Sequence, residues 1–221
     1  MATYKEIQGT AVQNYAGNLP GAVNGQVWYD STNNDFKYPN VTAVGTWATG
    51  NSLNTVRSQL MGARYQTNSA GLAFGGSPTL AVTELYNGTN WTEVNDLSTG
   101  RRDGAGAGIS TGALCFGGAT TAPVGVTETW NGTNWTEVND LNTSRRRLGG
   151  AGTSTSALTF GNNVPSGSAD ATESWNGTNW TEVNNLNTGR GYMASAGADN
   201  TAALASGGEV SPGSTTAATE L

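Results

Sequence analysis

The sequence of 221 residues contains no histidine, a single cysteine (Cys115) and only ten Lys and Arg residues. Without histidine, catalytic triads built on an imidazole base and Cys/His metal sites are excluded. One cysteine cannot form a disulfide within the chain. No apolar run approaches the roughly 20 residues that a membrane-spanning helix needs, so we expect no membrane insertion.

Acidic residues outnumber basic ones: 16 Asp and Glu residues give the chain a formal net charge of -6. Binding to a phosphate backbone requires a basic surface, so we expect no nucleic-acid partner. The glycine-rich run at 104–108 follows no strand and opens no helix, which excludes a phosphate-binding loop. The remaining aspartates show no spaced catalytic motif. We therefore expect no enzymatic activity, no cofactor and no metal.

The chain is rich in small and polar residues instead, with 32 glycines and many Thr, Asn and Ser. This composition favours short strands joined by tight turns. The triplets Asn-Gly-Thr at Asn87, Asn131 and Asn176 match the acceptor pattern for N-glycosylation. Because Met1–Thr10 does not resemble a secretion signal, we interpret these triplets as turns.

One stretch recurs along the sequence. The segment from Tyr86 to Arg101 returns almost unchanged at 130–145 and at 175–190, and a divergent copy precedes it. In every copy the Trp and the Arg are ten residues apart, with Trp at positions 47, 91, 135 and 180. A period of roughly 20–50 residues indicates a solenoid, a propeller or an array.

Each repeat divides into four short strands. In the second complete copy we expect strands at 104–110, 113–116, 126–130 and 134–138. The dipeptide Asn131-Gly132 between the last two strongly predicts a hairpin, because both residues tolerate the positive φ of a type I′ turn. Four short antiparallel strands per repeat are typical of a propeller blade.

These motifs resemble the kelch repeat, in which a double Gly after an apolar strand precedes Thr-Glu, an aromatic residue, Trp and Arg. The resemblance covers about residues 41–221. It implies an all-β fold, namely a small kelch-like β-propeller of four four-stranded blades. Two copies depart from this pattern: one has Gly161-Asn162 in place of the double Gly, and the last has Ala205-Ser206 before Gly207-Gly208.

The ends of the repeat region suggest how the propeller closes. The last copy has three expected strands, whereas Val41–Trp47 has the pattern of a fourth strand without the first three. Pairing of Val41–Trp47 with the last blade would complete that blade and remove two unpaired edges. The alternative is head-to-tail pairing, in which each chain donates this strand to a neighbouring chain.

Three residue types recur in fixed phase and are predicted to build the frame. We expect the tryptophans to pack between blades and the acidic and basic residues to form ion pairs, since a buried carboxylate without a partner is costly. The predicted structural residues are Trp47, Trp91, Trp135, Trp180, Arg57, Arg101, Arg145, Arg190, Glu84, Glu128, Glu173 and Glu220. Cys115 is expected to be an inert core thiol.

The loops that follow the double Gly differ most between copies, and we expect them on one face together with the segments that end at the repeat arginines. Divergent loops on a fixed frame are a common way to build a binding site. Extra basic residues nearby could contact an anion or a sugar, although a solvated charge run is the simpler interpretation. The candidate binding residues are Arg102, Arg146, Arg147, Asn162, Asn163 and Glu209.

The N-terminal part has a different character. Residues 1–25 are polar and aperiodic, which indicates an extended arm, and Gln26–Tyr38 predicts a hairpin ended by Pro39. The opening residues and Gly25–Thr32 resemble the start of tail-fibre-like and other virion proteins of marine tailed bacteriophages. We therefore expect two parts, an anchoring arm with a hairpin at 1–40 and the propeller at 41–221.

The resemblance implies a non-enzymatic virion structural protein, made in the host cytoplasm and present in multiple copies or as a homo-oligomer. Its arm would contact other virion proteins, and its loops would contact a host-surface glycan or a protein. The alternatives are a cellular kelch-type scaffold that binds a partner protein and, less favoured, a glycan-active enzyme.

Overall fold

The computed structural model describes residues 13–17, 27–37, 49–63, 69–162 and 169–221. All regular structure in these ranges is β-strand, as the sequence predicts, and it divides into two compact units, residues 1–49 and 50–221. None of the described segments forms a helix long and apolar enough to cross a membrane.

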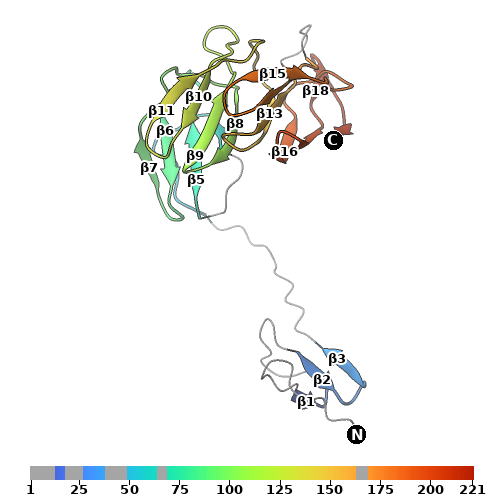
Figure 1. The fold of residues 1–221 in the computed structure, drawn as a ribbon. Helices are drawn as coiled ribbons and strands as arrows, with labels where there is room; N and C mark the ends of the chain where they lie inside the picture. The colour runs from blue at the N-terminus through green and yellow to red at the C-terminus, as the bar shows by residue number, and fades with distance from the viewer. Residues whose placement is uncertain (1–12, 18–26, 38–48, 64–68, 163–168) are drawn as a thin grey trace. The chain divides into compact units, whose positions relative to one another are not determined.

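The first unit contains a three-stranded sheet (Figure 1). Strands β2 (Trp28–Asp30) and β3 (Asp35–Lys37) form the predicted hairpin, and β1 (Gln13–Tyr15) adds to β2 in parallel. The sequence predicts an extended arm over residues 1–25, and this prediction is wrong for Gln13–Tyr15, which pairs with β2. The buried Asp30 fixes β1: its Oδ1 accepts a hydrogen bond from the Gly17 N–H at 2.8 Å.

The second unit consists of four sheets built from consecutive strands (Figure 1). The first sheet comprises β4 (Met61–Gly62), β5 (Gly71–Phe74), β6 (Thr83–Tyr86) and β7 (Trp91–Val94). The second comprises β8 (Ala105–Ile109), β9 (Gly112–Phe116), β10 (Thr127–Trp130) and β11 (Trp135–Val138). The third comprises β12 (Gly149–Gly152), β13 (Ala157–Phe160), β14 (Thr172–Trp175) and β15 (Trp180–Val183). The fourth comprises β16 (Ala194–Asp199), β17 (Ala202–Ser206) and β20 (Thr219–Glu220), with a separate small hairpin of β18 (Glu209–Ser211) and β19 (Ser214–Thr215).

The repeated sheets are antiparallel, and their register follows the Asn-Gly turn. In the second sheet Trp130 pairs with Trp135 across this turn. The Asn131 side chain accepts hydrogen bonds from the backbone N–H groups of Thr133 and Asn134 at 2.9 and 2.8 Å, and Gly132 has φ +94°. Asn131 does not adopt positive φ, and residues 131–134 separate the paired tryptophans, so the hairpin forms but the predicted type I′ turn is wrong. The same arrangement recurs at Asn87 and Asn176, so the triplets act as turns.

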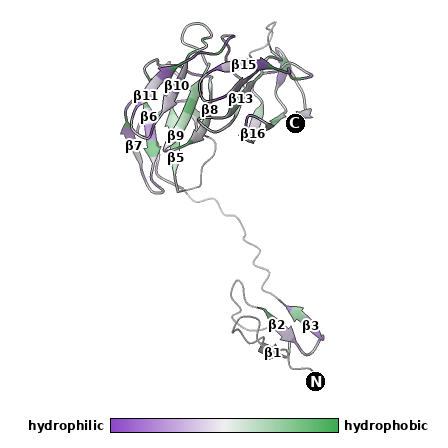
Figure 2. Ribbon diagram, viewed as in Figure 1, coloured by the Kyte–Doolittle hydropathy of each residue, from purple (hydrophilic) through white to green (hydrophobic). Residues whose placement is uncertain are grey.

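The first strands of adjacent sheets approach closely, in the order β4, β8, β12 and β16. Their Gly/Ala-rich sequences explain how. A Cβ atom at Gly106 would lie 2.4 Å from the Gly62 carbonyl oxygen, and one at Gly150 would lie 2.7 Å from Cζ of Phe116. The second strands behind them are apolar; in Figure 2, β5 and β9 are more hydrophobic than the outer strand β7.

The tryptophans that open β11 and β15 pack on the preceding sheet, whereas Trp91, which opens β7 of the first sheet, lies against Tyr86 with 5.0 Å between ring centroids. The Trp135 ring lies edge-on to Phe74 with 4.9 Å between centroids, and Trp180 lies likewise on Phe116 at 5.0 Å. The indole N–H of Trp135 donates to Thr83 Oγ1 at 3.0 Å, and Trp180 donates to Thr127 Oγ1 at 3.0 Å. These contacts join the sheets in series.

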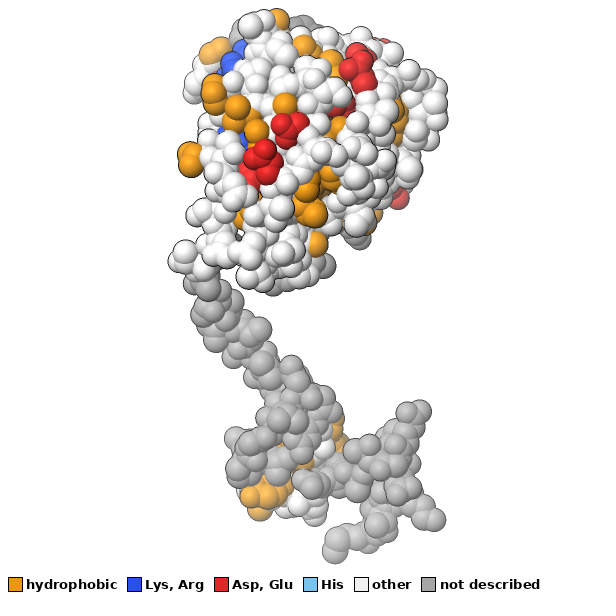
Figure 3. All heavy atoms as spheres, turned by 90° about the vertical axis from the view of Figure 1, so that its left-hand side faces the viewer, with side chains coloured by type: hydrophobic (Ala, Val, Ile, Leu, Met, Phe, Trp, Pro, Cys, Tyr) orange, Lys and Arg blue, Asp and Glu red, His pale blue; other side chains and the backbone are white. Residues whose placement is uncertain are grey.

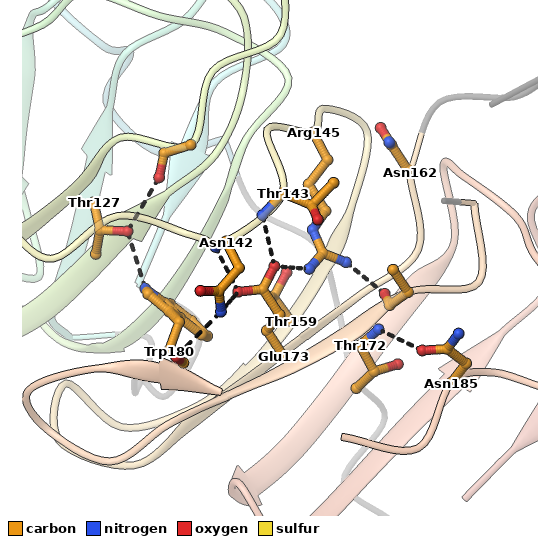
Figure 4. Close-up of polar contacts among 12 residues, drawn as sticks. Thr127, Asn142, Thr143, Arg145, Thr159, Asn162, Thr172, Glu173, Trp180 and Asn185 are labelled. Atoms are coloured by element: carbon orange, nitrogen blue, oxygen red, sulfur yellow. Dashed lines mark hydrogen bonds and ion pairs between the residues drawn. The ribbon is translucent and has the colours of Figure 1, made fainter. Parts of the chain in front are cut away.

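Buried ion pairs provide the second link between repeats. Each repeat arginine contacts the glutamate of the next third strand, and the Arg101 and Glu128 side chains are fully buried. Glu173 also accepts hydrogen bonds from the backbone N–H groups of Asn142 and Thr143, as Figure 4 shows. The four pairs are Arg57–Glu84, Arg101–Glu128, Arg145–Glu173 and Arg190–Glu220.

In the first repeat, such hydrogen bonds hold the Glu84 carboxylate in its charged form. Burial works against ionisation of Glu84, but the Asn54 and Thr55 backbone N–H groups and the Arg57 guanidinium outweigh it and lower the pKa of Glu84. The loop and the third strand of each repeat are therefore fixed to each other without a large apolar core between them.

Within the described ranges the four sheets form no closed ring. The expected closing strand, Val41–Trp47, lies outside these ranges, and so the predicted packing of Trp47 lies outside them too. In β16, alternate residues from Ala194 onward are exposed, whereas β12 is buried throughout. The side of the fourth sheet that another sheet would cover is thus open to solvent.

Candidate binding site on the loop face

The loops after the Gly-Gly positions and the segments around the repeat arginines lie at the same end of the sheets. The Gly76 N–H donates to the Arg101 carbonyl at 2.9 Å, and the Gly118 N–H donates to the Arg145 carbonyl at 2.8 Å. We call this end the loop face. The Asn-Gly turns join the third and fourth strands at the other end of the sheets.

Four of the six candidate binding residues are tied to neighbouring loops. Arg102 donates from Nη1 to Thr79 Oγ1 at 2.9 Å. The Arg146 N–H donates to Oδ1 of the buried Asn162 at 3.1 Å. Glu209 pairs with Gly191, its N–H donating to the Gly191 carbonyl at 2.8 Å.

The remaining two candidates have different outcomes. Asn163 lies outside the described residues. Arg147 belongs to a set of four residues, each two positions after a repeat arginine, that all adopt positive φ. We call this set the turn ladder; its members are Gln59 (φ +53°), Asp103 (φ +59°), Arg147 (φ +60°) and Tyr192 (φ +56°).

Backbone hydrogen bonds connect the turn ladder from sheet to sheet. The Asp103 N–H donates to the Gln59 carbonyl at 3.2 Å, the Arg147 N–H to the Asp103 carbonyl at 2.6 Å, and the Tyr192 N–H to the Arg147 carbonyl at 2.9 Å. Positive φ is uncommon in non-glycine residues and concentrates at functional sites. In the turn ladder, positive φ lets the backbone of each turn hydrogen-bond to that of the next. These turns lie directly before the close-packed first strands.

The side chains of the turn ladder interact with one another. Arg147 Nε lies 3.8 Å from Asp103 Oδ2, and its guanidinium carbon lies 4.4 Å from the centroid of the Tyr192 ring. The Tyr192 residue is 51% exposed, whereas the Asp103 side chain is only 6% exposed. The guanidinium is thus held between a carboxylate and an aromatic ring, with part of its surface open to solvent.

A cavity of about 480 Å³ adjoins this group. It is lined by Tyr192, Gly208, Glu209, Gly213 and Thr215, and so connects the turn ladder to the β18–β19 hairpin. The Glu209 carboxylate accepts a hydrogen bond from the Gly213 N–H at 3.1 Å, which holds the hairpin loop.

This combination of groups suits polar recognition. A fixed guanidinium donates paired hydrogen bonds, and an exposed aromatic ring offers an apolar surface beside it. Across the described ranges, no three His, Cys, Asp or Glu side chains are arranged to hold a metal ion. Such a guanidinium can donate to hydroxyl or carboxylate oxygens.

Sequence reasoning missed three members of the turn ladder, namely Gln59, Asp103 and Tyr192. The signal was present, because the position two residues after the repeat arginine carries a different side chain in each of the four copies. Variation at a fixed phase of an otherwise repetitive sequence marks a position at which the frame does not constrain the type of side chain.

Comparison with known proteins identifies the fold. No protein-family model and no curated protein matches the sequence. Among solved structures, the one titled "Structure of YjhT" matches with a TM-score of 0.61 at 13% identity. The chain has a β-propeller-like fold. The match covers 76% of this chain and spans 63% of that one, and at this identity the likeness concerns the fold alone.

Proposed function

We propose that this protein is a non-enzymatic bacteriophage virion protein of the tail-fibre, appendage or capsid-decoration type, in which a kelch-like propeller displays a binding face. Residues 1–40 attach it to other virion proteins, and the loop face binds a host-surface glycan or a protein. The virion assignment is supported by the resemblance of the N-terminal segment, and the kelch assignment by the repeat motifs.

The turn ladder carries the proposal for the binding face. Its backbone repeats from sheet to sheet, while Gln59, Asp103, Arg147 and Tyr192 differ in size, charge and polarity. A frame that repeats under side chains that do not repeat is typical of recognition surfaces. The repeated Glu and Arg side chains form buried ion pairs within the frame. Because these carboxylates are buried, they are unsuited to catalysis on a bound substrate.

The binding face can be tested with an array of bacterial surface polysaccharides and the full-length protein. The variant Tyr192→Ala removes the exposed ring, and Arg147→Ala removes the guanidinium beside it. We expect each to weaken binding at least tenfold, since such anchor residues dominate many interfaces. The matched control is Glu137→Gln on the outer strand β11, which lies away from the loop face. Unchanged binding by both variants would refute this role.

The virion assignment has its own test. Deletion of residues 1–38 should abolish incorporation into phage particles while binding of the loop face to the same polysaccharides persists. A cellular kelch-type scaffold would instead retain its protein partner after the deletion and be missing from purified particles.

The proposal includes the completion of the fourth sheet. We propose that the segment carrying Trp47 supplies the fourth strand of this sheet, beside β20, because Trp47 occupies the repeat position of the other tryptophans that open a fourth strand. This strand would cover the free edge of β20, which is otherwise available for unwanted pairing.

A further inference from the structure

The third sheet carries an unfilled copy of the tryptophan contact that joins the other sheets. A cavity of about 190 Å³ is lined by Phe160, Thr172, Leu186, Asn187 and Ala205, among others. Phe160 and Thr172 stand in the repeat where Phe74 and Thr83 receive Trp135. We call this cavity the tryptophan socket.

The two filled sockets show what the third one recognises. In each, the indole ring packs edge-on against a phenylalanine and its N–H donates to a threonine hydroxyl on a third strand. Figure 4 shows the second case, Trp180 with Thr127. In addition, Asn142 Nδ2 donates to the Trp180 carbonyl at 3.1 Å.

All three elements are present in the tryptophan socket. Phe160 supplies the ring, Thr172 supplies the hydroxyl, and Asn187 corresponds to Asn142. Asn187 and Thr188 already bind Glu220 through their backbone N–H groups, as Asn142 and Thr143 bind Glu173. The loop is therefore held in the conformation that receives a tryptophan in the other repeats.

The chain contains a matching strand, and the described residues after it establish its phase. Asn95 directly follows the fourth strand β7 and donates to Asn134 Oδ1 at 2.6 Å. Asn51 makes the equivalent bond to Asn90 Oδ1 at 2.6 Å. Residues 47–50 therefore hold the sequence position of a fourth strand of a sheet that would precede the first one, with Trp47 in the place of Trp135.

The exposure of β16 decides which copy provides this strand. If the first sheet of the same chain followed the fourth, β4 would cover β16 as β12 covers β8. Instead, Ala194, Ala196 and Ala198 of β16 are exposed, although β4 and β16 are both described. The first sheet of the same chain is thus not beside the fourth.

From these observations we propose that the tryptophan socket docks the Trp47 strand of a second copy of this chain. The indole packs on Phe160 and donates to Thr172, while residues 48–50 pair with β20. The inference rests on the proposed completion of the fourth sheet and assigns the strand to a second copy. Addition of a strand to an exposed edge is a common recognition mode. Because the contact is head-to-tail, it joins copies into a ring or a row.

The register of the complete sheets defines a cross-linking test. Thr129 pairs with Thr136 on neighbouring strands, and the equivalent positions at the contact are Leu221 and Ala48. In full-length protein carrying Ala48→Cys and Leu221→Cys, mild oxidation should produce disulfide-linked dimers or larger species on a non-reducing gel. Cys115 is fully buried, so it contributes no background. The matched control, Thr129→Cys with Thr136→Cys, should cross-link within one chain.

Two results would overturn the proposal. A disulfide confined to single chains would show that a chain fills its own socket. Absence of any cross-link between residues 48 and 221, while the Thr129/Thr136 control reacts, would show that the strand does not dock there.

Sedimentation measurements test the recognition of the indole. Trp47→Ala should raise the dissociation constant for self-association roughly 30-fold or more, as expected for the loss of a buried tryptophan anchor. The control Thr42→Ala, in the same segment, should leave it unchanged. Equal effects of both, or no effect of Trp47→Ala, would contradict the proposal. Polysaccharide binding at the turn ladder is measured separately, so either idea can fail alone.

Discussion

Replacement of Glu128 by Gln tests whether the buried ion pairs hold the repeats together. The substitution keeps the size of the side chain but removes its charge, and it leaves the fully buried Arg101 guanidinium without its counter-ion. The new amide also presents a donor near the Ser98 N–H, which donates to Glu128 Oε2 at 2.7 Å. Removal of one partner of a buried pair costs about 3–5 kcal/mol.

For a unit of this size, a loss of about 3–5 kcal/mol lowers the midpoint of thermal unfolding by roughly 6–20 °C. Thermal and urea unfolding followed by tryptophan fluorescence would measure it. The control is Glu137→Gln: Glu137 is the direct cross-strand neighbour of Glu128 but is exposed, so its loss should cost less than about 0.5 kcal/mol. Glu220→Gln should have an intermediate effect, because that side chain is 15% exposed. A cost below about 1 kcal/mol for Glu128→Gln would refute the assigned role.

A glycine substitution and the chemical modification of Cys115 test the packing of the frame. Gly106→Ala should destabilise the protein by about 1–3 kcal/mol in urea unfolding, because its Cβ would lie 2.4 Å from the Gly62 carbonyl oxygen. Gly112→Ala is the control, since its nearest neighbour would be Ser154 Oγ at 3.4 Å; equal costs would contradict the argument. Burial raises the pKa of Cys115 to about 11, so a thiol reagent at pH 8 should modify the protein only after unfolding. Modification of the native protein at the unfolded rate would show that the thiol is accessible.

The strands of the repeats could be predicted because several local signals agree. Asn131-Gly132 sets the turn, the apolar residues of 113–116 fit a buried strand, and the recurrence of Trp and Arg fixes the phase. The same agreement is missing for β1, since Gln13–Tyr15 has no apolar alternation and depends on hydrogen bonds with Asp30 and Ser31. The β18–β19 hairpin likewise lies in one of the loops that differ between the copies.

The candidate site was harder to predict than the frame. The charge of Arg102, Arg146 and Arg147 stands out in the sequence, but the Arg102 guanidinium is bonded to Thr79, and only the backbone N–H of Arg146 is bonded to Asn162. The position shared by Arg147 and Tyr192 is defined by backbone conformation rather than by residue type. Charge can be read from the sequence, whereas a positive φ in four unlike residues cannot.

The same repeats would allow the proposed binding face and the proposed assembly contact to coexist in one small fold. The buried Arg–Glu pairs fix each loop to the next third strand, and the Trp–Phe contacts join the first sheet to the second and the second to the third. Neither contact involves the residue two positions after the arginine. Side chains of the turn ladder can therefore vary without loss of the Arg–Glu pairs or the Trp–Phe contacts. At the fourth sheet the repeat has lost its phenylalanine, since Ser206 stands where Phe116 and Phe160 stand in the preceding sheets. That sheet offers no aromatic surface for a further tryptophan, so docking at the Phe160 socket completes the fourth sheet without providing an equivalent site beyond it.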